Sequence, residues 1–92
     1  MHTCMNEGAV IARLKRIEGQ VRGIIKLVEK DAACEDILMQ ISAAKSALHK
    51  TGQTILEKHV QHCVREDLDS GDAEHTLEKL SKAIEYFSRM TS

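Results

Sequence analysis

The segment VIARLKRIEGQVRGIIKLV, residues 10–28, decides the fold class of this 92-residue chain. Its apolar positions recur every three or four residues, at Val10, Leu14, Ile17, Val21, Ile24 and Val28. That period is typical of an amphipathic helix that packs against a partner. The sequence therefore predicts a first helix over residues 6–29.

A second and longer apolar stripe follows the break KDAA at residues 30–33. It predicts a helix over residues 33–66, and at about 1.5 Å per residue such a helix is about 50 Å long. One short companion helix cannot cover that length, so we expect a partner subunit to cover part of it. The stripe consists of Ile37, Ile41, Ala44, Leu48, Thr51 and Ile55, and continues through Val60 and Val64.

The stretch DLDSGDAE, residues 67–74, supplies the next turn. Gly71 is expected to stop the second helix, and Asp72 to cap the third at its N-terminus. The third helix is predicted over residues 73–89, with an apolar stripe of Leu77, Leu80, Ile84 and Phe87. The prediction is an all-α fold with one domain over residues 1–92.

The composition supports this fold class and excludes several functions. There is no proline, there are five glycines, and the chain is rich in residues that favour helices. One Phe, one Tyr and no Trp exclude a surface that stacks aromatic rings on single-stranded nucleic acid. No apolar run approaches the roughly 20 residues that cross a bilayer, and the N-terminus lacks a signal pattern. We therefore expect a cytoplasmic protein with no membrane partner.

Charge is distributed unevenly along the chain. Residues 1–65 carry ten Lys/Arg and seven Asp/Glu, a net charge of +3, whereas residues 66–92 carry three and seven, a net charge of −4. Within residues 9–26 five basic residues face one acidic residue, Glu18. The first predicted helix is therefore basic. Such a face is either a solvated surface or a site for an anionic partner.

His59 and Cys63 are the first candidate metal ligands. They are four residues apart, which places both on one face of a helix, and imidazole with thiolate suits Cu(I), Zn(II) or Ni(II). A core histidine beside a buried thiol is the alternative. Cys34, at the far end of the same helix, reaches them only if two copies of that helix pack antiparallel in a dimer. Three cysteines, an odd number, also fit a reducing compartment.

Three segments resemble one known family. RLKRIEGQVRGI at residues 13–24, CEDILMQISAAKSAL at 34–48 and EKHVQHCV at 57–64 are similar to the CsoR/RcnR family of metal-sensing repressors, and the spacing of Cys34, His59 and Cys63 resembles its copper-sensing branch. The resemblance implies three-helix subunits that form an antiparallel four-helix-bundle dimer and then a dimer of dimers. It also implies double-stranded operator DNA as the partner of the metal-free protein, with release when Cu(I) binds.

The same resemblance assigns residues. It implies trigonal Cu(I), with Cys34 from one subunit and His59 and Cys63 from the other. The basic positions that face DNA in the family correspond in this sequence to Arg13, Arg16, Lys45 and Lys50. Duplex DNA favours such cations because they neutralise phosphates.

Two departures from the copper-sensing pattern keep nickel open. The residues that support the ligands there, a Tyr before the first Cys and a Glu on the third helix, correspond here to Ala33 and Lys79, although Glu78 or Glu74 could substitute. His2 lies 32 residues before Cys34, the spacing of an N-terminal ligand in the nickel and cobalt sensors. A set of His2, Cys34, His59 and Cys63 suits Ni(II).

Other functions remain as alternatives. A thiol sensor of the same fold would use Cys34 and Cys63 to react with a persulfide or an aldehyde. A cysteine hydrolase built on Cys34 and His59 lacks a glycine-rich nucleophile turn and an orienting third residue, so we expect no enzyme and no small-molecule substrate. A helical scaffold or metal chaperone without DNA is disfavoured by the basic first helix.

Overall fold

The structure is a computed structural model that describes residues 5–90, apart from the side chains of Cys63, Val64 and Asp67. Every regular element in these residues is helical, which confirms the all-α prediction. None of the helices found among them is long and apolar enough to span a bilayer. In chain order the elements are α1 (Glu7–Glu29), α2 (Cys34–Lys58), the π-helix η1 (His59–Val64), α3 (Arg65–Asp69) and α4 (Ala73–Arg89).

The predicted helix bounds agree closely with the structure except in the second helix. Residues 33–66 were predicted as one α-helix, whereas the structure has α2, η1 and α3 in direct succession, ending at Asp69. A π-helix has a wider turn, in which each backbone amide donates a hydrogen bond to the carbonyl five residues earlier. The apolar period does not report this local change, so the sequence did not predict it.

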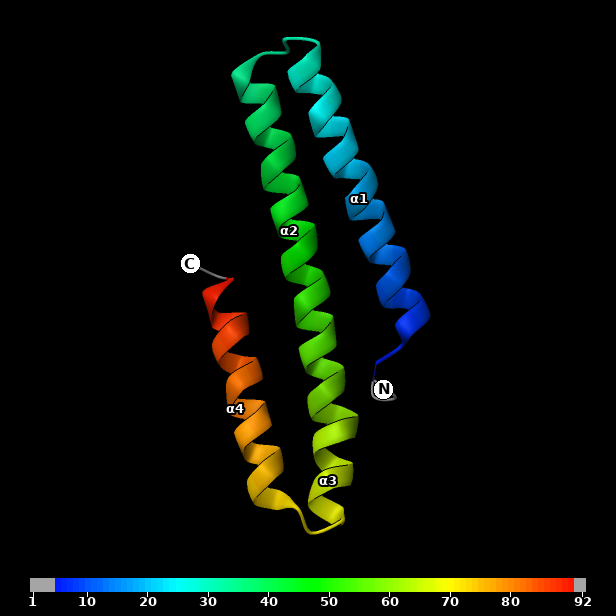
Figure 1. Ribbon diagram of the computed structural model, residues 1–92, viewed down its shortest axis with the longest axis vertical. Coiled ribbons are helices and arrows are strands. Elements are labelled where there is room, and N and C mark those ends of the chain that lie inside the picture. The colour runs from blue at the N-terminus through cyan, green and yellow to red at the C-terminus, as the bar shows by residue number, and fades with distance from the viewer. Residues whose placement is uncertain (1–4, 91–92) are drawn as a thin grey trace. The chain divides into compact units, whose positions relative to one another are not determined.

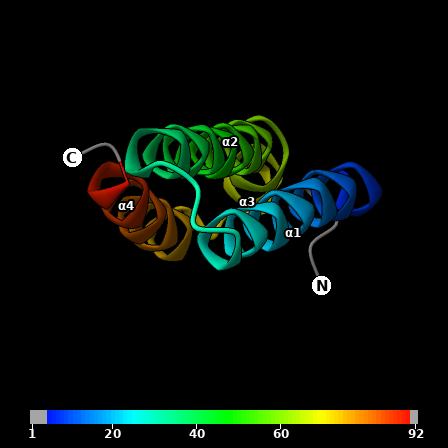
Figure 2. The same ribbon diagram turned by 90° about the horizontal axis from the view of Figure 1, so that it is seen from above.

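Residues 8–51 form one compact unit, the N-terminal hairpin, which contains α1 and most of α2. The two helices run antiparallel, and Figure 2 shows the turn that joins them. Asp31 has a left-handed φ of 58°, while the Asp31 and Ala32 amides donate to the Val28 and Leu27 carbonyls at 3.1 and 3.0 Å. A left-handed residue with these two hydrogen bonds, one spanning five residues and the other three, is the Schellman motif that ends a helix.

The core of the N-terminal hairpin is built from every seventh residue. Val10 and Ile17 of α1 are buried, as are Ala44 and Thr51 of α2. The Thr51 hydroxyl donates to the Ala47 carbonyl at 2.8 Å, so its burial leaves no unpaired donor. The small Ala44 and Thr51 side chains allow the two helices to approach closely.

The other half of each apolar stripe stays exposed in one chain. On α1 and α2 the alternate stripe positions have exposed fractions between 43% and 58%, although all of them are large apolar residues. The stripe is therefore wider than the contact within the hairpin, and these side chains are available for a second contact. They are Leu14, Val21, Val28, Ile41 and Leu48.

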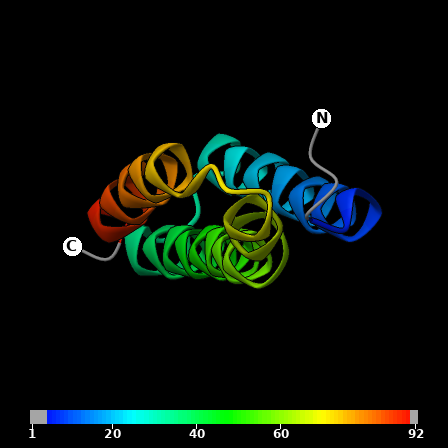
Figure 3. The same ribbon diagram turned by 90° about the horizontal axis from the view of Figure 1, so that it is seen from below.

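Residues 5–7 and 52–90 belong to the second compact unit, the C-terminal hairpin. Its helix α4 packs against η1 and α3 (Figure 1), and Figure 3 shows the turn before α4. Gly71 in that turn has a left-handed φ of 90°, and its amide donates to the Leu68 carbonyl at 3.2 Å. Asp72 is the N-cap of α4, as predicted, although its side chain makes no capping hydrogen bond.

Candidate functional site

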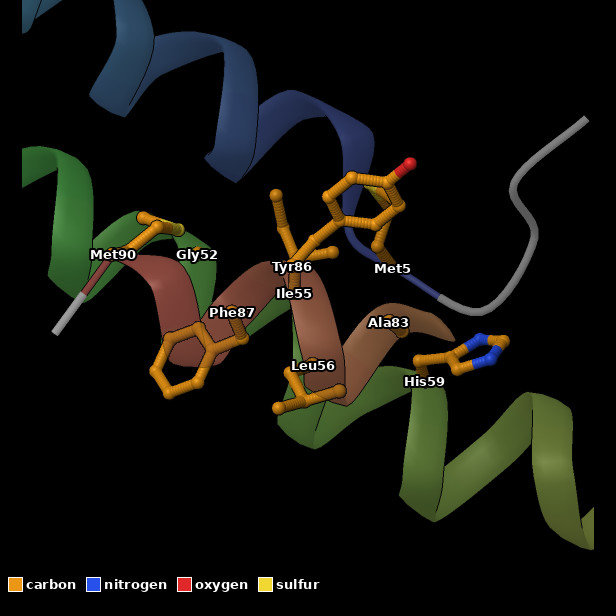
Figure 4. Close-up of a pocket in the computed structure, with 9 residues that line it drawn as sticks. All are labelled: Met5, Gly52, Ile55, Leu56, His59, Ala83, Tyr86, Phe87 and Met90. Atoms are coloured by element: carbon orange, nitrogen blue, oxygen red, sulfur yellow. The ribbon is translucent and has the colours of Figure 1, made fainter. Parts of the chain in front are cut away.

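His59 is the first residue of the π-helix η1 and is half-buried. It lies beside an apolar cavity of about 340 Å³ within the C-terminal hairpin (Figure 4). The other lining residues are Met5, Gly52, Ile55, Leu56, Ala83, Tyr86, Phe87 and Met90.

Close packing of α4 against α2 shapes this cavity. A Cβ added at Gly52 would lie 3.0 Å from Cε and 3.3 Å from Sδ of Met90, so the absence of a side chain at Gly52 allows Met90 to approach α2. Ala83, Tyr86 and Phe87 of α4 line the cavity, together with Met90, the residue that directly follows α4. Glu74 and Glu78, which the sequence suggested as supports for His59, are exposed residues of the first two turns of α4 and are not among its lining residues.

Cys34 is the first residue of α2, and its thiol is exposed and not part of a disulfide. The carbonyl of Ala33 accepts hydrogen bonds from the Asp36 and Ile37 amides at 3.0 and 3.2 Å, which fixes the backbone at the start of the helix. Helix α2 has 25 residues, from Cys34 to Lys58, and His59 follows directly as the first residue of η1. The whole of α2 therefore separates Cys34 from His59 along the chain.

The remaining two candidate ligands are only partly covered. Cys63 lies in η1, four residues after His59, but its side chain is outside the described residues, as is the whole of His2. Both residues belong to the six-residue π-helix η1, and the pairing of their side chains stays a prediction. Among the side chains that the structure does describe, no three His, Cys, Asp or Glu gather as a metal site.

A second hollow, of about 480 Å³, lies between α1 and α2 of the N-terminal hairpin. Three of its lining residues are Arg13, Arg16 and Lys50, which are exposed candidates for DNA contact. Neither arginine pairs with a carboxylate in residues 5–90, whereas Arg22 of the same helix contacts Glu18 at 3.5 Å. We call this hollow the basic groove; its other lining residues are Ile17, Gln20, Ala47 and Thr51.

The lining of the basic groove differs from the sequence-based prediction at two residues, Gln20 and Lys45. Gln20 lines the groove but was not proposed as a functional residue. It lies four residues after Arg16 and seven after Arg13, so helical periodicity could have placed it on their face. Lys45 is an exposed residue of α2 outside the groove lining.

Most of the chain matches one known protein family. Residues 6–89 match the family model described as a metal-sensitive transcriptional repressor. The chain is 47% identical over 77 residues to a copper-sensing transcriptional repressor, CsoR, of Bacillus subtilis. That match covers 84% of this chain and 76% of the relative.

Two solved structures share the fold. The copper-sensing repressor CsoR with Cu(I) from Geobacillus thermodenitrificans superposes with a TM-score of 0.84 at 46% identity, covering 88% of this chain and 84% of that one. The nickel-responsive transcriptional regulator InrS superposes with a TM-score of 0.81 at 30% identity, covering 95% and 98%.

Proposed function

Because this chain belongs to the metal-sensitive transcriptional repressor family, we propose that it represses transcription by binding operator DNA when metal-free, and releases the DNA when Cu(I) binds. One observation carries the proposal. The same small chain contains the basic groove and a half-buried histidine, His59, which is followed four residues later by Cys63. Family members are repressors, and we propose no catalytic role for Cys34 or His59.

The proposed ligands are Cys34, His59 and Cys63. Two thiolates and an imidazole form a soft donor set that suits Cu(I) and disfavours Mg(II) and Ca(II). Bound there, Cu(I) would supply strong bonds that hold the three residues together. Because all 25 residues of α2 precede His59 and begin at Cys34, one chain cannot bring the two residues together along that helix. The site therefore requires Cys34 from a second copy.

A second copy also satisfies the exposed apolar residues of the N-terminal hairpin. Leu14, Val21, Val28, Ile41 and Leu48 remain between 43% and 58% exposed in one chain. Because about half of each side chain is already covered, burying the rest stabilises each by roughly 1 kcal/mol, and the sum favours association. We propose a homodimer whose α2 helices pack antiparallel, and a homotetramer made of two such dimers.

The basic groove is the proposed contact for double-stranded DNA. Arg13 and Arg16 carry no acidic partner in residues 5–90, so phosphates do not have to displace one. Each phosphate that a cation neutralises releases counterions and strengthens binding. Lys50 shares the groove, and Lys45 adds an exposed cation on α2 outside it.

Metal and DNA are linked thermodynamically. If bound metal lowers the affinity for DNA by some factor, bound DNA lowers the affinity for metal by the same factor. The metal must therefore favour a conformation in which the grooves of the assembled copies no longer match the DNA. The continuous succession of α2 and η1 connects the two activities, since Lys45 and Lys50 lie on the helix that leads into His59.

Nickel is the second candidate, and one contact favours it. Met5 lines the same cavity as His59, so the N-terminal segment reaches the neighbourhood of a proposed ligand. His2 lies three residues before Met5 and could add a second imidazole. A set of two nitrogen and two sulfur donors suits Ni(II).

The proposal is tested by metal-driven release of DNA. Reduced, metal-free protein is bound to a duplex from the promoter of its own transcription unit, then titrated separately with Cu(I) and Ni(II) while fluorescence anisotropy follows release. Stoichiometric release by Cu(I), lost in Cys34→Ala and kept in His2→Ala, is the expected result. Release by Ni(II) alone, with dependence on His2, would assign the protein to nickel.

Two other outcomes contradict metal sensing. DNA that stays bound with either metal but is released by a persulfide would make the protein a thiol sensor that uses Cys34 and Cys63. Failure of the metal-free protein to bind any duplex would remove the repressor function itself. Metal uptake measured on the same sample distinguishes a chaperone from an inactive preparation.

A further inference from the structure

The basic groove contains one neutral side chain with unused hydrogen-bonding capacity. Arg13, Arg16 and Lys50 line it together with Gln20. Gln20 is exposed, and its amide has no hydrogen-bond partner among the described residues. The other neutral polar residue there, Thr51, is buried and its hydroxyl donates to Ala47. Gln20 is thus the groove's neutral residue with both donors and an acceptor available.

The groove's charged and neutral residues offer different chemistry to DNA. Cations gain most of their binding free energy from phosphates, and that gain is independent of sequence and falls as salt rises. A glutamine amide carries no charge, so its contribution comes from directed hydrogen bonds. In the major groove its geometry matches adenine, where N7 accepts and the N6 amino group donates.

We propose that Gln20 is a specificity-determining residue, which pairs with an adenine edge in the major groove while Arg13, Arg16 and Lys50 hold the flanking phosphates. This inference rests on the proposed function, because it requires that the basic groove bind duplex DNA. The position of Gln20 supports the assignment, since it lies one helical turn beyond Arg16 on the same face of α1. Phosphates held by the arginines would fix the register in which the amide meets the base.

The test separates sequence recognition from general DNA affinity. The Gln20→Met variant keeps the length and helix propensity of the side chain and removes its hydrogen-bonding atoms. Metal-free protein is titrated with the promoter duplex and with a shuffled duplex of equal length, at several salt concentrations. Gln40→Met is the matched control, because Gln40 is also an exposed glutamine of the same hairpin but lies on α2 and does not line the groove.

We expect Gln20→Met to bind the promoter duplex about 5- to 100-fold more weakly, while its affinity for the shuffled duplex and the salt slope stay unchanged. Replacing each A·T pair of the promoter in turn should reveal one pair that matters to the unmodified protein and not to the variant. Gln40→Met should behave as the unmodified protein does with both duplexes.

Three results would overturn the inference. Equal weakening on both duplexes would make Gln20 a contact to phosphate or a structural residue, and no change on either would leave it without a role. Weakening on the promoter without loss of preference at any single pair would exclude an adenine contact. The Arg16→Ala variant separates failure of the Gln20 inference from failure of the proposed function. If this variant binds both duplexes normally, the basic groove does not bind DNA, and the proposed DNA interface is wrong.

Discussion

The two hairpins differ most in charge. The N-terminal hairpin, residues 8–51, carries eight Lys/Arg and five Asp/Glu, a net charge of +3, whereas the C-terminal hairpin, residues 5–7 and 52–90, carries five and nine, a net charge of −4. The first hairpin contains the basic groove, and the second contains His59 and its apolar cavity. A near-neutral chain thus separates a surface that attracts phosphates from one that repels them. Net charge alone would have hidden this division.

The largest effects should come from disabling one hairpin while leaving the other intact. Arg16→Ala removes a charged contact of about 1.5–3 kcal/mol, so operator affinity should fall at least about tenfold in anisotropy titrations. The salt slope should also decrease by about one per lost phosphate contact. Lys15→Ala, at an exposed α1 position outside the groove, should change little. Metal affinity of both variants should stay unchanged.

The reciprocal variant is His59→Ala. Loss of a residue that merely supports a ligand already weakens metal binding by about 10- to 100-fold, so loss of a ligand should weaken it further. The metal-free variant should still bind the operator, and competition with a Cu(I) chelator measures the affinity. Loss of both activities in either variant would show that the two hairpins do not work separately.

Substitutions in the turns of the two hairpins should have effects of intermediate size on the free energy of unfolding. Both turns have a left-handed residue, Asp31 in the first and Gly71 in the second. A side chain in this conformation costs about 1–2 kcal/mol, less for Asp. Gly71→Ala should therefore lower the free energy of unfolding by about 1 kcal/mol. Asp31→Gly should change it by less than about 0.5 kcal/mol, because relief of strain is offset by a more flexible unfolded chain.

Urea unfolding at one fixed protein concentration checks this pair, since association affects the apparent stability. Equal losses in both variants would mean that the conformation of the turn does not determine the cost.

The smallest expected effect distinguishes two buried threonines. Thr51 in the N-terminal hairpin has a bonded hydroxyl, whereas the buried Oγ1 of Thr76 in the C-terminal hairpin has no hydrogen-bond partner in the described structure. Thr76→Val should raise the free energy of unfolding by about 1 kcal/mol, because an unpaired buried polar atom is removed. Thr51→Val should give no such gain. A loss at Thr76 in the same urea experiment would indicate that its hydroxyl has a partner in the assembled protein.

Periodicity predicted the helices well because each one is amphipathic over many turns. It placed the ends of the first and third helices within one residue of the structure. It could not separate the stripe residues that contact each other within one hairpin from those left exposed, because Ile17 and Val21 follow the same pattern. That distinction depends on which helix lies opposite, and sequence spacing does not contain it.

The functional residues divide in the same way. The sequence alone proposed His59 and the basic residues as candidates, since their chemical types occur at the spacing that the proposed sites need. It did not point to Tyr86 or Gln20, which are near those residues through folding. The cavity beside His59 joins segments more than twenty residues apart in the chain, so only the packing of α4 on α2 and η1 reveals it.

The change from α2 to the π-helix η1 and back to α3 has a consequence for how fast this helix opens. Along α2 each backbone amide donates to the carbonyl four residues earlier, but around His59 and again near Arg65 the donors must switch partners. At these positions the backbone hydrogen bonds have less regular geometry, so less free energy is needed to break them and expose the amides to solvent. Local opening should therefore begin in the six residues of η1 and not in the middle of α2. A ligand that joined His59 to Cys63 would then act on the fastest-exchanging part of the helix, and it would slow hydrogen exchange there more than anywhere else along it.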